Sequence, residues 1–305
     1  MLTYAKMMRP CLLLLCVALY LPNSVVAAAG SHEAVDSEGN RISLPEPARR
    51  IISLSPHITE LLFAAGAGEY IVAVTDYSDY PPAARKIERI GNAQRVDMER
   101  LVSLKPDLVV AWTSGNSAGD IAAIRRIGIP VFYSDPKHLE DIPAQLNNLA
   151  KLTATKKTAA RSSAIYSKKY EKLLAARRRG NRNNRNTNKV SLFYQLWRQP
   201  LMTVNRNHLI NDVIELCGGE NVFASSAAMT PVVEIESIIA ANPRVIVASN
   251  VTRSELISAW KKWPAIDAVK KGRFVVIPAD LIHRPGPRII QAAELMCREI
   301  AASGV

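Results

Sequence analysis

MERLVSLKPDLVVAW, residues 98–112, and IESIIAANPRVIVAS, residues 235–249, are two copies of one pattern that align without a gap. The identical positions are Glu99 and Glu236, Pro106 and Pro243, Val110 and Val247, and Ala111 and Ala248. In each copy an amphipathic stretch predicts a short helix, the proline marks a turn, and the apolar run after it predicts a buried strand. A repeated unit of this kind indicates a duplicated α/β lobe.

The duplication extends in both directions from these windows. Downstream, GIPVFYSD ends at Asp135 and GRFVVIPAD ends at Asp280, so each apolar strand is followed by a carboxylate. Upstream, SPHITELLFAAGAG (55–68) and NHLINDVIELCGG (207–219) have the pattern of helices that stop at glycines. We therefore predict an α/β fold made of two Rossmann-like lobes.

A single long helix is expected to join the lobes. No proline or glycine occurs between Pro143 and Gly180, and apolar positions recur at intervals of three and four. A helix from about Lys156 to Arg178 would span roughly 34 Å at 1.5 Å per residue, which is long enough to brace both lobes. The predicted organisation is an N-terminal lobe at 31–152, a linking backbone helix at 153–180 and a C-terminal lobe at 188–305.

The composition is that of a globular protein with a basic surplus. Of 305 residues 48% are hydrophobic and 22% charged, and 39 Lys and Arg against 27 Asp and Glu give a net charge of +12. Six basic residues lie within RRRGNRNNRNTNK, residues 177–189, which has no apolar side chain and no aromatic residue for base stacking. We interpret this segment as a solvated loop rather than a nucleic-acid arm, and we expect no nucleic-acid partner.

The first 29 residues predict a cleaved secretory signal peptide. Lys6 and Arg9 precede an apolar run at 11–21, and small residues at 27–29 suit a signal peptidase. The run is about half of the roughly 20 residues that cross a bilayer, which disfavours a permanent anchor helix. Lipoprotein attachment through Cys16 is disfavoured as well, because Leu15 stands where Gly or Ala is required.

Removal of this signal leaves Cys217 and Cys297 as an even pair in an exported chain. We expect them to form a disulfide, because exported proteins reach oxidising compartments. Closing this loop would contribute on the order of 4 kcal/mol on the chain-entropy model. Two buried thiols or a shared metal ion are the alternatives.

Signatures of common enzyme classes are absent. The chain has no P-loop, no HExxH and no GxSxG motif, and its five histidines are too scattered to predict a zinc site. A secreted hydrolase using Ser114 or Ser55 would need a base and an orienting acid that the sequence does not identify. A cell-surface adhesion module would need neither the duplication nor the long helix. We therefore expect a protein that is not an enzyme and carries no catalytic cofactor.

Aromatic residues stand where predicted strands lead into loops. Tyr77 lies in TDYSDYPP, Trp112 ends the strand of the first repeat, and Trp197 follows the strand SLFYQL. Strand ends of doubly wound lobes face the ligand crevice, and aromatic faces there suit a broad, flat ligand. Packing within the core is the alternative for each of them, and it is our preferred interpretation for Trp260 and Trp263.

Three further residues are candidates for specific roles. His57 follows Ser55 and Pro56, which have the pattern of an N-cap and a first helical residue, so its imidazole should stay neutral and able to bind a metal. Capping the helix is the alternative. Glu99 and Glu236 open equivalent helices and would present one carboxylate on each lobe to a two-fold partner, unless they only complement the helix dipole.

Several phrases together resemble the periplasmic cobalamin-binding proteins of ABC importers, which belong to the solute-binding class built on a helical backbone. The phrases are RIISLSPHITELLFAAGA, YSDYPPAARKIE, MERLVSLKPDLVVAW, VIELCGGENVF and PRIIQAAELMC, in that family's order and spread over nearly the whole mature chain. Single phrases such as LKPDLVV also occur in relatives that carry haem or ferric siderophores, which are therefore the alternative ligands.

The resemblance implies a function and roles for individual residues. It implies a monomeric periplasmic receptor that captures cobalamin between two lobes and delivers it to a dimeric permease in the inner membrane. It makes Tyr77, Trp112, Asp280 and Arg284 contacts of the corrinoid, with aromatic planes for the ring and polar groups for its amide side chains. It also makes Glu99 and Glu236 the carboxylates that dock onto permease arginines, and Cys217 and Cys297 the family's disulfide.

Two differences from the family alter the expected pocket. Ala93 and Thr230 stand where the cobalamin binder has tryptophans, and His57 replaces a small residue. We therefore expect Trp197 to supply some of the lost stacking. A second hypothesis is that His57 ligates the corrinoid cobalt.

Overall fold

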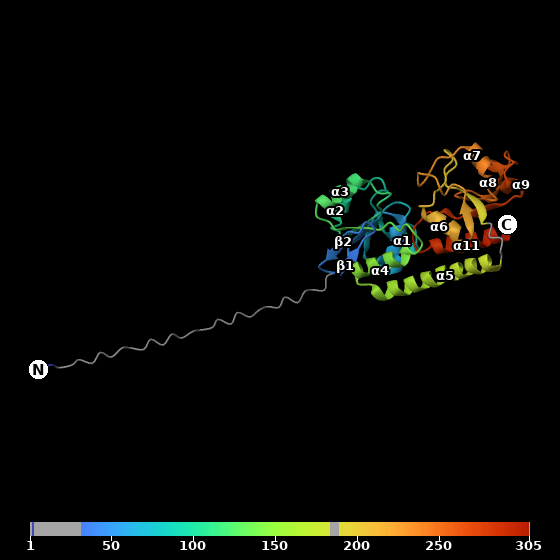
Figure 1. Cartoon of the computed structure of the whole chain (residues 1–305). Helices are drawn as coiled ribbons and strands as arrows, with labels where there is room; N and C mark the ends of the chain where they lie inside the picture. Colours follow the sequence, from blue (N-terminus) through green and yellow to red (C-terminus); the bar gives the residue numbers. More distant parts are fainter. Residues whose placement is uncertain (1, 3–31, 184–188, 305) are drawn as a thin grey trace. The chain divides into compact units, whose positions relative to one another are not determined.

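The computed structural model describes residues 2, 32–183 and 189–304. The predicted signal peptide, residues 1–29, lies outside the described residues apart from Leu2. Figure 1 shows two α/β lobes with the long helix α5 alongside them. Among the described residues no helix has the length and apolar character needed to cross a membrane.

The N-terminal lobe contains a parallel sheet in the order β5-β4-β3-β6-β7. Its strands are β3 (Ile51–Ser53), β4 (Ile71–Val74), β5 (Glu88–Arg89), β6 (Leu108–Ala111) and β7 (Val131–Tyr133). Its helices are α1 (Pro56–Ala65), α2 (Met98–Ser103), α3 (Ala118–Arg126) and α4 (Asp141–Thr153), with 3-10 turns at Gly68–Tyr70 and Pro82–Lys86. An antiparallel hairpin of β1 (His32–Val35) and β2 (Arg41–Leu44) packs beside α4.

The C-terminal lobe contains a second parallel sheet in the order β9-β8-β10-β11. Its strands are β8 (Val190–Gln195), β9 (Gly219–Asn221), β10 (Val245–Ser249) and β11 (Phe274–Ile277). Its helices are α6 (Leu209–Leu216), α7 (Ile235–Ala241), α8 (Arg253–Trp260), α9 (Asp267–Lys270), α10 (Ala279–Ile282) and α11 (Ile289–Ala302).

The two sheets confirm the predicted duplication. The repeated windows become α2 with β6 and α7 with β10, and both strands are buried along their whole length, as expected for strands covered on both faces. Matching these strands pairs β4-β3-β6-β7 with β9-β8-β10-β11, and β5 is an additional edge strand. The helices before the windows end as predicted at glycines with positive φ, at Gly66 and just before Gly218.

The long helix α5 spans Lys156–Asn183 and contacts both lobes (Figure 1). It packs on α1 and α4 of the first lobe and on α6 and α11 of the second. Ser162 Oγ donates to the carbonyl oxygen of Ala64, and Tyr166 OH donates to that of Leu139. The lobe boundaries given above stay a prediction, but the helix occupies the predicted position between the two sheets.

The helix is longer than predicted, because residues 177–183 are helical rather than part of the loop expected at 177–189. The prediction relied on polarity, whereas arginine has a high helix propensity and the preceding turns already supply a nucleus. Residues 184–188 of this segment lie outside the described residues.

One hydrophobic cluster extends through both lobes along α5, and it includes Ile58, Ala159, Tyr166 and Ile290. The opposite face of each sheet has its own cluster. Trp260 is buried in the cluster of the C-terminal lobe, donates its Nε1–H to Gln195 Oε1 at 2.9 Å and packs against Trp263. The prediction of a core residue is therefore confirmed for Trp260, and Trp263 is a partly buried residue packed against the same cluster.

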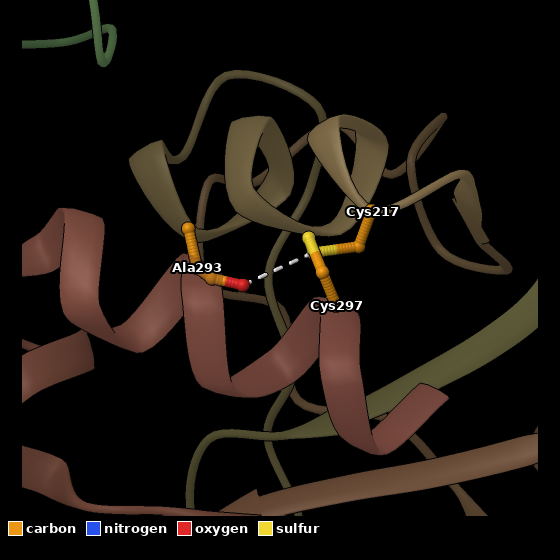
Figure 2. Close-up of a disulfide and its surroundings, with 3 residues drawn as sticks. All are labelled: Cys217, Ala293 and Cys297. Carbon is orange, nitrogen blue, oxygen red and sulfur yellow. Dashed lines mark hydrogen bonds between the residues drawn. A yellow bond between two sulfur atoms is a disulfide. The ribbon is translucent and has the colours of Figure 1, made fainter. Parts of the chain in front are cut away.

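The predicted disulfide between Cys217 and Cys297 is present and joins the end of α6 to α11 (Figure 2). The Cys217 sulfur, which carries no hydrogen once bonded, lies 3.5 Å from the carbonyl oxygen of Ala293. The bond links residues 80 positions apart within one lobe, so it stabilises that lobe rather than the connection between lobes.

Candidate ligand-binding site

A cavity of about 220 Å³, which we name the cleft cavity, lies between the two lobes. Its N-terminal wall consists of Trp112, Ser114, Asp135, Pro136 and Lys137. Its C-terminal wall consists of Leu196, Asn207, His208, Leu209, Met229, Ile282, His283 and Pro285. Trp112, Asp135 and Leu196 follow the carboxyl ends of β6, β7 and β8, where ligand sites of doubly wound sheets form.

Asp135 organises the N-terminal wall. Its Oδ1 accepts from Trp112 Nε1 at 3.1 Å, and its Oδ2 accepts from Ser114 Oγ at 2.8 Å and from Lys137 Nζ at 2.6 Å. The Asp135 side chain is 5% exposed, so these bonds are shielded from water and hold the indole in one orientation.

The indole of Trp112 is also confined by its neighbours. It lies so close to Gly115 that a Cβ at position 115 would overlap the ring. On another side the His57 ring meets it edge-on, with centroids 5.4 Å apart. Trp112 is therefore a pre-oriented aromatic wall, as expected for a ligand contact that loses little entropy on binding.

His57 supports this wall and does not line the cleft cavity. It is buried, its Nε2 donates to the carbonyl oxygen of Ser134 at 3.3 Å, and its Nδ1 accepts from Ser55 Oγ at 2.7 Å. Burial lowers its pKa to about 4, so the ring is neutral as predicted. Both nitrogens are engaged with the protein, which disagrees with the expectation of a nitrogen available to a ligand metal.

Two other histidines reach the cleft cavity from the C-terminal lobe. His208 is the N-cap of α6, where its Nδ1 accepts from Ile210 N at 3.1 Å, and burial lowers its pKa to about 4. The neutral ring must therefore carry its proton on Nε2. His283 Nε2 lies 2.8 Å from Ser249 Oγ and 3.0 Å from Tyr194 OH, and desolvation lowers its pKa as well.

Asp280 and Arg284, predicted to contact the ligand, belong to what we name the inter-lobe ion cluster. Its members are Glu60 and Asp79 of the N-terminal lobe and Asp280, Arg284 and Arg288 of the C-terminal lobe. Arg284 donates to Asp79 at 2.8 Å, to Asp280 at 2.8 Å and to Glu60 at 3.1 Å. Arg288 donates to both oxygens of Glu60, at 2.8 and 2.6 Å, and covers the Tyr80 ring at 3.9 Å.

The two remaining aromatic candidates are on the surface. Tyr77 is 76% exposed and has φ of 63°, a conformation that is uncommon outside glycine and often found at functional loops. It lies two residues before Asp79, so the ion cluster anchors its loop. Trp197 is 56% exposed and lines a small adjoining cavity together with Leu196 and His283, which also line the cleft cavity.

Glu99 and Glu236 occupy equivalent positions as the second residues of α2 and α7. Both are exposed, and within 32–183 and 189–304 neither side chain makes a hydrogen bond or an ion pair in the structure. Three residues further on, Val102 and Ile239 are also matched and exposed. Each lobe therefore presents the same carboxylate and aliphatic pair.

Sequence reasoning did not assign several residues of the cleft cavity, among them Asp135, Lys137, His208 and His283. Asp135 was recognised only as a strand end, the two histidines only as scattered histidines, and Lys137 had no motif. The signal for Asp135 was its position after a buried strand, which also placed Trp112. The other three face the cavity only because the two lobes come together.

The described part of the chain contains no group of three or more His, Cys, Asp or Glu side chains that could hold a metal ion. Ser55 and His57 form a hydroxyl and imidazole pair of the kind a hydrolase uses, but both are buried and no carboxylate orients the ring.

Comparison with known proteins identifies the family. The periplasmic binding protein family model matches residues 51–281. The chain belongs to this family of periplasmic binding proteins. It is 35% identical over 260 residues to a vitamin B12-binding protein of Vibrio cholerae serotype O1, covering 84% of this chain and 90% of that one.

Solved structures of the family have the same fold. The periplasmic vitamin B12-binding protein BtuF of Vibrio cholerae superposes with a TM-score of 0.76 at 33% identity, covering 85% of this chain and 98% of that one. The periplasmic heme-binding protein RhuT from Roseiflexus superposes with a TM-score of 0.70 at 26% identity, covering 85% and 100%. The fold is therefore that of helical-backbone binding proteins, with two lobes and one linking helix, as predicted.

Proposed function

We propose that this protein is a periplasmic receptor that binds cobalamin in the cleft between its lobes and delivers it to a dimeric ABC permease in the inner membrane. The family membership and the vitamin B12-binding relatives support this function. The single observation that carries the choice of ligand is the balanced charge of the cleft cavity, beside a pre-oriented tryptophan.

The charges of the residues that line the cleft cavity sum to zero. Asp135 and Lys137 form an ion pair at 2.6 Å, and the lowered pKa values of His208 and His283 keep both rings neutral near pH 7. Arg284 lies beside this cavity but is occupied by three carboxylates. Such a lining suits a ligand whose periphery is made of neutral amides, as in a corrinoid.

Haem and ferric siderophores are the alternative ligands, and they differ in charge. Haem carries two propionates, and its burial without cationic partners would be costly. The cleft cavity offers one cation, Lys137, and that cation is already paired. The observation that favours haem is the presence of two imidazoles in the wall, but His208 presents a protonated Nε2 and therefore a donor rather than a metal ligand.

Within this proposal Trp112 and Tyr77 contact the corrin, and Trp197 extends the aromatic surface at the adjoining cavity. Asp280 and Arg284 would contact corrinoid amides at the edge of the cleft without leaving the ion cluster. His57 holds Trp112 in place, and its coordination of cobalt stays a prediction. Coordination of cobalt would require the His57 ring to lose its hydrogen bond with Ser55 or Ser134.

Docking is proposed to use the matched carboxylates. Glu99 and Glu236 stand free on equivalent helices of two similar lobes, so they complement a partner with two equivalent cationic positions. Charge-assisted pairs of this kind steer and register an encounter. The proposed role is transport as a monomer, with no covalent chemistry.

The ligand can be identified by absorption spectroscopy. Purified protein is titrated separately with aquocobalamin, haemin and a ferric hydroxamate siderophore, and bound pigment is measured after dialysis. We expect retention of the corrinoid at one per chain and weaker or no retention of the others. Retention of haemin or siderophore in preference to the corrinoid would refute the proposed ligand.

Substitution of Trp112 tests the location of the site. Trp112→Ala should weaken corrinoid binding roughly tenfold or more, because stacking and hot-spot aromatics contribute about 1–3 kcal/mol. Trp263→Ala is the matched control and should retain the affinity, because Trp263 is partly buried in the C-terminal lobe and does not line the cleft cavity. His57→Ala tests cobalt coordination, which an unchanged spectrum of bound aquocobalamin would reject.

A further inference from the structure

A second and larger cavity, about 380 Å³, lies beside the long helix, and we name it the strut-side cavity. It shares no lining residue with the cleft cavity. Its walls come from three parts of the fold, namely α1 and the loop at Tyr80 and Pro81, then α5, then the start of α11 with the two residues before it. A molecule bound here would touch both lobes and the helix that joins them.

Most of the wall is apolar. Phe63 of α1, Ile165 of α5 and Ile290 of α11 line the cavity together with two prolines. Ile165 is 53% exposed, although α5 is otherwise rich in charged residues on its exposed positions. An exposed isoleucine at the rim of a cavity leaves apolar surface that a ligand would cover, at about 25 cal/mol per Å².

The charged side chains in the wall of the strut-side cavity, Glu60 and Arg288, already have partners within the protein. Both oxygens of Glu60 accept from Arg288, and one also accepts from Arg284. The Arg288 guanidinium in turn lies over the Tyr80 ring. The charges of these groups are therefore compensated without a charged group from a ligand.

One end of the cavity holds an ion pair that is accessible to solvent. Lys169 Nζ lies 3.2 Å from Glu294, and both side chains are 38% exposed, so this pair is weak and open to exchange. Gln291 lies three residues before Glu294 on α11, on the same face of the helix, and it lines the cavity together with Lys169. Within the residues that the structure describes, the Gln291 side chain makes no hydrogen bond.

We propose that the strut-side cavity binds a small amphipathic monocarboxylate, with its apolar body against Phe63, Ile165 and Ile290 and its carboxylate between Lys169 and Gln291. The Lys169 ammonium and the Gln291 amide supply hydrogen-bond donors for one carboxylate. The guanidinium of Arg288 is already paired with Glu60, so no second carboxylate is expected to bind. This site is independent of the corrinoid proposal, because it lies outside the cleft cavity.

Calorimetric titration with octanoate and with octanamide, its neutral isostere, tests the proposal on the full mature chain. We expect octanoate to bind at one site, and octanamide to bind roughly tenfold more weakly because a charge-assisted bond is lost. Lys169→Gln should bring the two ligands to similar affinity. Ile165→Glu should abolish binding of octanoate, because it places a carboxylate at the rim.

Ile257→Glu is the matched control, since Ile257 is an exposed isoleucine on α8 in the C-terminal lobe. It should bind octanoate like the wild type, and cooperative thermal unfolding of each variant shows that it is folded. The proposal is overturned if the wild type binds neither ligand, if octanamide binds as well as octanoate, or if Ile165→Glu leaves binding intact. Cobalamin retention is measured separately, so failure here does not bear on the proposed transport function.

Discussion

Replacing Glu60 by alanine tests the inter-lobe ion cluster. Glu60 is 2% exposed on α1, and it accepts three hydrogen bonds from Arg284 and Arg288, which lie more than 220 residues away in sequence, at separations of 224 and 228. Removing one partner of a buried ion pair costs about 3–5 kcal/mol, because the remaining charge is left buried without compensation. Arg284 keeps Asp79 and Asp280, so the lower end applies, and we expect a loss of about 3 kcal/mol.

The loss is read from thermal unfolding followed by circular dichroism. A change of 1 kcal/mol shifts the melting temperature by about 2–4 °C in a chain of this size, so Glu60→Ala should melt roughly 6 °C lower or more. Glu294→Ala is the matched control, because it breaks a second ion pair that involves the C-terminal lobe, the Lys169–Glu294 pair. That pair is exposed, and its loss should cost about 0–1 kcal/mol.

The reasoning rests on burial rather than on the presence of a salt bridge. If Glu60→Ala melted within about 1 °C of the wild type, or no lower than Glu294→Ala, the cluster would contribute nothing beyond a surface pair. Equal effects of the two variants on the melting temperature would have the same meaning.

Three further predictions concern pH, the disulfide and docking. Burial lowers the pKa of His57 and of His208 to about 4, so between about pH 6.5 and 4 the unfolded chain binds protons on these rings that the folded chain does not bind. The contribution of these histidines to the free energy of unfolding should therefore be fully present above about pH 6.5 and fall as the pH drops towards 4, by about 3 kcal/mol for His57. His57→Ala should show a shallower decline of the urea midpoint with falling pH. A wild-type midpoint that does not change with pH would contradict this. Reduction with dithiothreitol, or Cys217→Ser with Cys297→Ser, should lower the free energy of unfolding by about 4 kcal/mol in urea, and an unchanged midpoint would show that the bond adds no stability. Glu99→Lys or Glu236→Lys should each weaken docking to permease vesicles roughly tenfold while corrinoid retention is unchanged, with exposed Glu220→Lys as the control; undiminished docking of the double variant would exclude these carboxylates.

The duplicated lobes, the linking helix and the disulfide could be predicted because each has a local or countable signal. The helix and strand of each repeat follow from periodicity within 15 residues, and α5 follows from a long stretch free of proline and glycine. Two cysteines that remain after removal of a signal leave one possible intramolecular pairing. The end of α5 was misplaced because polarity alone does not distinguish a solvated loop from a solvated helix.

The candidate site was predicted only in part. Trp112 was found because it follows a recognisable strand, and strand ends face the crevice. The neutral charge expected for His57 agrees with its buried position, and its role toward the ligand stays a prediction. The sequence does not show that Ser134 and Trp112 lie against the ring. The ligand contacts expected of Asp280 and Arg284 stay predictions, and the ion pairs of Arg284 with Glu60 and Asp79 had no sequence signal.

By itself the sequence determined the α/β class, the two equivalent lobes, the helix between them and the matched carboxylates on α2 and α7. Periodic patterns record which face of each element is buried, and these features depend on nothing else. The tertiary structure alone decided which side chains meet across the lobes. The charge balance of the cleft cavity, the burial of Glu60 and the strut-side cavity all depend on contacts between residues distant in sequence, and those contacts exist only once the lobes have packed against α5 and each other.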